Sequence, residues 1–75
     1  MILYEETHSL RLGETEHAMI RALMFTARPV RWAVNQGVRP VISWFTHPYD
    51  DYARIYRIEG ELTPEQQTEF ILRFT

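Results

Sequence analysis

Hydrophobic positions alternate with polar ones at the start of the chain. Ile2, Tyr4, Leu10 and Leu12 share one parity within residues 1–12, a pattern that predicts an extended segment. Glu6 and His8 fall on the same parity and interrupt it. We therefore expect a break or a bulge near Thr7.

The pattern becomes helical after Gly13. Apolar positions then recur at steps of three and four, namely Ile20, Leu23, Ala27, Val30 and Val34, which predicts one buried helical face. Proline inside a helix removes a hydrogen bond and clashes with the preceding turn. We therefore expect a kink or break near Arg28, with Pro29 starting a second helical piece. Gly37 is expected to end that piece as a left-handed cap residue, with Val38 supplying a hydrophobic contact.

Residues 30–45 also fit a β-hairpin. Val30, Trp32 and Val34 alternate before the loop "NQG", and a three-residue loop containing glycine suits a hairpin. The two interpretations place Arg31 and Trp32 differently. They point to opposite faces in the hairpin and lie side by side on the rim of the helix.

Two strands and a helix are expected in the second half. Residues 41–45 form an apolar, β-rich run, and residues 52–59 alternate cleanly, with the turn-forming sequence "THPYDD" between them. These runs predict an antiparallel pair. Thr63, Pro64 and Gln66 then form a capping-box pattern at the start of a helix. Phe70, Ile71 and Phe74 are expected on one face of that helix.

The predicted order is strand, kinked helix, strand, strand, helix. This order is typical of a small α+β domain, with two layers around one core and an antiparallel sheet. At 75 residues the chain is long enough for one compact domain spanning residues 1–75. Trp44, in an apolar strand, is expected in the core, whereas Trp32, beside Arg31, fits either the core or a binding surface.

Composition favours a cytoplasmic protein. The chain has no cysteine, whereas a secreted domain of this size usually carries disulfides. The sequence "MILYEETHS" has neither a basic region nor an apolar run, so no signal peptide is expected. No apolar run approaches the roughly 20 residues of a membrane span, so no membrane association is expected.

Charge is divided along the chain. Residues 17–49 carry four arginines and no acidic residue, whereas acidic residues predominate in residues 50–75, within a net charge of −2. This division predicts a dipolar molecule if the fold keeps the two segments apart. All eight positive side chains are arginine; this usage fits either interface chemistry or the codon bias of a GC-rich genome.

Catalytic and cofactor motifs are absent. The three glycines are isolated, so no phosphate-binding loop is expected, and Ser9 and Ser43 lack a nucleophile elbow. His47 lies near Asp50 and Asp51, but without the paired-histidine spacing of a helical zinc site. We expect these three to be solvated turn residues and expect no metal or cofactor; His8, beside Glu5 and Glu6, is expected to form a surface pair.

Aromatic and arginine content favours a protein-binding surface. Interface centres are enriched in tryptophan, tyrosine and arginine, and the chain has two, four and eight of these. The residues predicted to bind a partner are Arg28, Arg31, Trp32, Arg39, Tyr49, Tyr52, Arg54 and Tyr56. Small, acidic, cysteine-free proteins of bacteria and phages often bind one host protein. The function hypothesis is therefore a non-enzymatic inhibitor or adaptor of this kind. Exposed aromatic surface could also serve to form a homodimer.

Two alternatives belong to other functional classes. One is a small enzyme or ligand-binding subunit that uses His47, Asp50 and Asp51. The other is a single-stranded nucleic-acid binder, in which aromatic rings and arginines stack on bases. The sequence pI near 5.8 argues against the second alternative.

Overall fold

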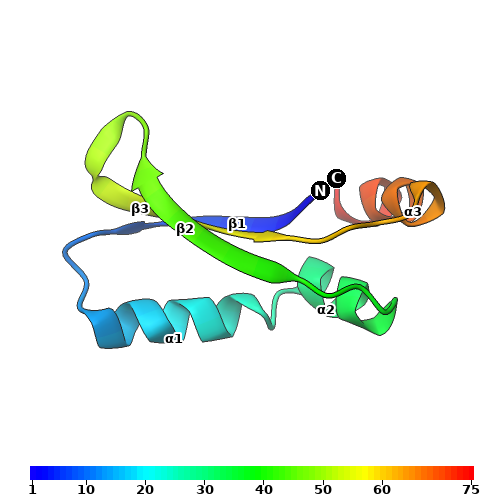
Figure 1. Cartoon of the computed structure of the whole chain (residues 1–75), viewed down its shortest axis with the longest axis horizontal. Coiled ribbons are helices and arrows are strands. Elements are labelled where there is room, and N and C mark those ends of the chain that lie inside the picture. Colours follow the sequence, from blue (N-terminus) through cyan, green and yellow to red (C-terminus); the bar gives the residue numbers. More distant parts are fainter.

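The computed structural model describes all 75 residues and confirms the α+β class (Figure 1). The elements are β1 (Ile2–Ser9), α1 (Glu14–Met24), α2 (Arg28–Asn35), β2 (Val41–His47), β3 (Asp50–Glu59) and α3 (Pro64–Phe74). The strands form one antiparallel sheet in the order β1-β3-β2. Figure 1 shows α1 and α2 on the same side of this sheet, and α3 beyond its end. None of the helices combines the length and the apolar character needed to cross a membrane.

The predicted break before Pro29 is confirmed. Ala27 has extended backbone angles and is the N-cap of α2, whose first turn contains Pro29. The hairpin alternative for residues 30–45 is wrong, because residues 28–35 are helical. The expectation of one continuous apolar face is also wrong, since Leu23 and Val34 are exposed. The extended residue between the helices resets the rotational phase, so the faces of α1 and α2 do not align.

The end of α2 follows the predicted cap. Gly37 has φ +84°, the left-handed conformation that glycine adopts without penalty. Its N–H donates to the Val34 carbonyl, and the Val38 N–H donates to the Ala33 carbonyl, both at 3.0 Å. This pair of bonds is the Schellman arrangement. Val38 is then buried in the core.

The sheet register determines which side chains face the helices. Tyr56 of β3 lies between Glu6 of β1 and Trp44 of β2, and paired residues share a face. Ile58 is next along this face, and both Tyr56 and Ile58 are fully buried. The core that forms here consists of Leu3, Met24, Val30, Ala33, Val38, Tyr56, Ile58, Leu62 and Phe70.

The irregularity in β1 lies at a different place from the one expected. The register shifts between Ile2 and Tyr4, not at Thr7. This shift lets Leu3 join the core beside Tyr4. Glu6 and His8 remain on the helix-facing side, where His8 Nε2 lies 3.1 Å from Glu6 Oε1. The predicted pairing of His8 with a neighbouring glutamate is present, but both side chains are half-buried and do not lie on the open surface.

Trp44 is not a core residue. Its side chain is 48% exposed, because β2 is an edge strand and only one side of the indole is covered. The guanidinium of Arg21 lies 4.6 Å from the centre of the ring, and the ring of Tyr56 lies 6.4 Å away. Apolar character along β2 therefore does not signify burial.

The capping box of α3 is confirmed. The Gln66 backbone N–H donates to the Thr63 hydroxyl, and the Thr63 backbone N–H donates to the Gln66 side chain. Of the three residues expected on one face of this helix, Phe70 is buried and Phe74 is partly buried. Ile71 is exposed, because it lies one helical position away from the row that faces the core.

Candidate functional site

An arginine-lined groove lies between α2 and α3. Its volume is about 380 Å³, and its walls are Arg28, Arg31, Trp32, Asn35, Arg73 and Phe74. The α2 residues lie one helical turn apart, because positions three and four residues apart share a helix face. Three of the eight predicted partner-binding residues, Arg28, Arg31 and Trp32, are thus brought together. Arg73 and Phe74 complete the groove from an element that the sequence did not link to it.

The groove carries more positive than negative charge. Arg28 and Arg31 are exposed and form no ion pair. Arg73 is paired at 3.0 Å with Glu69 of its own helix. Exposed ion pairs of this spacing contribute only about 0.3–0.5 kcal/mol. Arg73 can therefore exchange this partner for another carboxylate at little energetic cost.

Trp32 forms the apolar wall of the groove. Its ring packs at 5.9 Å from Phe70 and 6.0 Å from Phe74, measured between ring centres. The ring is thus fixed in position by α3. Its Nε1–H is buried and has no acceptor, which is unusual because buried indole donors are normally hydrogen-bonded.

The β2–β3 hairpin presents a second aromatic surface. Tyr49 is 93% exposed and Tyr52 is 70% exposed. Figure 1 shows this hairpin turn at the opposite end of the molecule from α2 and α3, and the longest dimension of the molecule is 39 Å. The predicted binding residues therefore do not form one surface.

Arg39 and the remaining predicted residues lie elsewhere. Arg39 lines a separate groove of about 640 Å³ with Glu59 and Glu61 near the start of β2, without forming an ion pair. Arg54 is half-buried and faces the interior with Tyr56. Tyr56 has no exposed surface. The folded protein cannot present Tyr56 to a partner, so its place among the surface residues was wrong.

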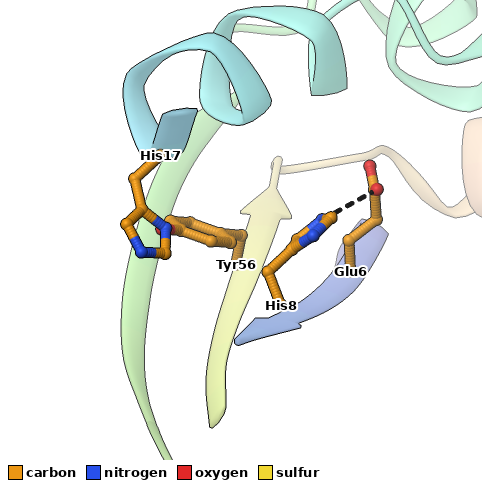
Figure 2. Close-up of polar contacts among 4 residues, drawn as sticks. All are labelled: Glu6, His8, His17 and Tyr56. Atoms are coloured by element: carbon orange, nitrogen blue, oxygen red, sulfur yellow. Dashed lines mark hydrogen bonds and ion pairs between the residues drawn. The ribbon is translucent and has the colours of Figure 1, made fainter. Parts of the chain in front are cut away.

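A buried polar cluster links α1 to the sheet (Figure 2). The Tyr56 hydroxyl contacts His17 Nδ1, and Arg54 Nη1 donates to the same hydroxyl at 3.3 Å. The hydroxyl oxygen is thus shared between Arg54 and His17. The other ring nitrogen of His17, Nε2, is buried without a partner. His17 is 1% exposed, and no sequence signal set it apart from a surface histidine in the first turns of a helix.

The rest of this cluster lies on β1. Figure 2 shows His8 between Tyr56 and Glu6, with a ring-centre distance of 5.9 Å from His8 to Tyr56. Burial, followed by the negative charge of Glu6, raises the pKa of Tyr4 above its ordinary value of 10.0. These contacts join β1 to β3, and the contact between His17 and Tyr56 joins α1 to β3. Only His17 and Tyr56 are fully buried, whereas Glu6 and His8 are half-buried, and neither of the protein's two pockets is lined by any of these residues.

His47, Asp50 and Asp51 form no converging site. His47 Nδ1 accepts from the Tyr49 backbone N–H at 3.0 Å, and Asp50 Oδ1 accepts from the Tyr52 backbone N–H at 2.9 Å. These bonds shape the hairpin turn. No three histidine, aspartate or glutamate side chains come together to hold a metal ion.

Comparison with known proteins adds no relative from which a role could be transferred. No protein-family model matches the chain, and neither a curated protein nor a solved structure matches it.

Proposed function

We propose that the chain is a non-enzymatic protein-binding module, which takes an acidic segment of a partner protein into the groove between α2 and α3. The observation that carries this proposal is the convergence of Arg28, Arg31 and Arg73 beside the edge of Trp32 and Phe74. Guanidinium groups bind carboxylates through two parallel hydrogen bonds. The neighbouring rings provide the apolar contact that interface centres require.

The biological setting of the proposal is an inhibitor or adaptor of a bacterium or phage, acting in the cytoplasm on one host protein. Tyr49 and Tyr52 belong to the β2–β3 hairpin turn and the start of β3, and this turn lies at the far end of the molecule (Figure 1). They contribute to the same complex only if the partner spans most of the 39 Å length. The groove alone is therefore the minimal binding site.

A charge-matched pair of variants tests the proposal. Arg31→Ala removes a groove arginine, and Arg11→Ala removes an exposed arginine from the loop after β1. The wild-type chain is used to capture a partner from lysate of the native host, and the dissociation constants of all three proteins for that partner are then measured. Arg31→Ala is expected to weaken binding about tenfold or more, since charge-assisted hydrogen bonds contribute about 1.5–3 kcal/mol. Arg11→Ala is expected to leave it within about twofold.

The alternatives predict different outcomes. An equal loss of binding in both arginine variants would contradict the groove as the binding site. A function based on the hairpin turn predicts that His47→Ala abolishes activity while Arg31→Ala has no effect. A nucleic-acid binder predicts a gel shift whose affinity falls steeply with salt.

A further inference from the structure

The outer edge of β2 has no partner within the chain. β2 pairs with β3 on one side only, and no backbone hydrogen bond of the strand goes to any other segment. An edge strand of this kind offers a row of unpaired N–H and C=O groups to another strand. Proteins usually protect such an edge with charged residues, prolines or a covering helix.

The two edges of the sheet differ in this protection. β1, the other edge strand, carries Glu5 and Glu6. β2 has the sequence "VISWFTH" and contains no Asp, Glu, Lys or Arg. Its exposed apolar side chains include Val41, which is 67% exposed, together with Trp44 and Phe45. Four of its seven residues are apolar, and an uncharged edge of this kind is a template for pairing with another strand.

We propose that β2 pairs with β2 of a second copy of this chain, antiparallel about a two-fold axis at Trp44. This register is the one that pairs all seven residues, so Val41 lies opposite His47 of the second copy. Pro40 and Pro48 flank the strand at equal distances from Trp44, and proline cannot donate to a ladder. They therefore end the pairing at the same position on both sides. The result is a continuous six-stranded sheet with the protected β1 strands at its edges.

Charge complementarity supports a second copy as the occupant. In this register Arg39 of one copy lies opposite Tyr49 of the other, beside the turn that carries Asp50 and Asp51. None of these three charged residues has an ion-pair partner within its own chain. The two-fold axis brings the positive end of one strand to the acidic end of the other, twice in each dimer. An isologous interface of this kind closes at two copies.

Mass and mutation test the dimer. Sedimentation equilibrium of the wild type is expected to show the mass of two 9.0 kDa chains, with dissociation on dilution. Ser43→Glu is compatible with the monomer, because Ser43 lies opposite Arg57 in the sheet. In the dimer it places two carboxylates diagonally across the axis, about 7–8 Å apart. It is expected to raise the dissociation constant about tenfold or more, whereas Thr7→Glu, on the exposed side of β1, leaves it within about twofold.

Cross-linking tests the register. The chain has no cysteine, so a single introduced cysteine reports one contact. Trp44→Cys is expected to form an intermolecular disulfide, because a residue on the axis faces itself at about 4.5–5.5 Å between Cα atoms, within disulfide range. Thr46→Cys lies two residues from the axis and is expected to cross-link at least about tenfold more slowly at that separation.

Charge reversal provides a test that spares Trp44. Arg39→Asp is expected to weaken the dimer, and Arg39→Asp combined with Asp51→Arg is expected to restore it. The proposal is overturned if the wild type is a monomer at all concentrations. It is also overturned if a dimer forms that Ser43→Glu and Thr7→Glu affect equally, since that dimer would use another surface.

Discussion

At the scale of single residues, the Tyr56 hydroxyl is the most connected polar group of the interior. It accepts a hydrogen bond from Arg54 and contacts His17 Nδ1 on α1. Both Tyr56 and His17 are almost completely buried. A buried polar group that loses its partner carries the full cost of its desolvation. Removal of the hydroxyl therefore costs the hydrogen bond and also the desolvation of the buried His17 ring that it contacts.

Tyr56→Phe is expected to destabilise the protein by about 1–3 kcal/mol. The substitution keeps the ring in the core but leaves both nitrogens of His17 without partners. Arg54 contributes less to this loss, because it is half-exposed and regains water. The free energy of unfolding, measured by urea denaturation, checks the expectation. Tyr52→Phe removes an exposed hydroxyl and should change stability by less than about 0.5 kcal/mol; similar losses in the two variants would contradict the role of the buried network.

The sequence predicted individual burial poorly where burial depends on distant segments. Trp44 was expected inside but lies on an edge strand, half exposed. Trp32 is the better covered indole, because Phe70 and Phe74 from the last helix pack against it. His17 is buried by Tyr56, which is 39 residues away along the chain. Hydrophobicity alone does not distinguish an edge strand from a central one.

At the scale of elements, the sequence predicted the boundaries that depend on local backbone chemistry. Pro29 in the first turn of α2, Gly37 after its end and the Thr63 capping box all lie where the pattern indicated. Each signal acts within a few residues, so it can be recognised without the tertiary fold. The prediction of one apolar face shared by residues 20–34 was wrong, because that face depends on the relative rotation of two helices and not on local backbone chemistry. An extended residue between two helices changes their relative rotation, which spacing along the sequence does not record.

Gly37→Ala tests the cap of α2. The added Cβ would have no atom within 4 Å, so the cost arises from the backbone alone. A left-handed conformation costs a residue with a Cβ about 1–2 kcal/mol, and that is the expected loss in free energy of unfolding. Gly37→Asn is the matched control, because asparagine tolerates this conformation better. Thermal or urea denaturation should rank the proteins as wild type, Asn variant and Ala variant, and an Ala variant as stable as wild type would contradict the strained cap.

At the scale of the whole molecule, the fold does not keep the two charged halves of the chain apart. β2, from the arginine-rich segment, is paired along its length with β3, from the acidic segment. Arg57 of β3 is in turn 2.7 Å from Glu5 at the start of the chain. The predicted dipole required the two segments to lie apart, and the structure does not meet this condition. The predicted binding residues are likewise dispersed: Arg28, Arg31 and Trp32 line the α2–α3 groove, Arg39 lines another groove, Tyr49 and Tyr52 lie at the hairpin turn, and Tyr56 is buried.

Stability is expected to be unevenly distributed over the molecule. β3 is paired on both sides and contains Tyr56 and Ile58, which are fully buried. Of the eleven residues of α3, only Phe70 is buried. The other contacts of α3 include the packing of the partly buried Phe74 against Trp32 and the 3.4 Å hydrogen bond from the Gln66 side chain to the Gln36 carbonyl. Elements with few buried contacts open locally at lower free energy than the core.

Native-state hydrogen exchange can measure this distribution. Amides of α3 are expected to exchange through local opening, with free energies below those of the Tyr56 and Ile58 amides and with little dependence on urea. Phe70→Ala should increase exchange throughout α3 by at least about tenfold, because truncating a buried phenylalanine costs about 3–5 kcal/mol. Leu72→Ala alters an exposed residue of the same helix and should leave the pattern unchanged. If α3 and β3 instead exchange with the same free energy and the same urea dependence, α3 unfolds only with the whole molecule, and the arginine groove is as rigid as the sheet.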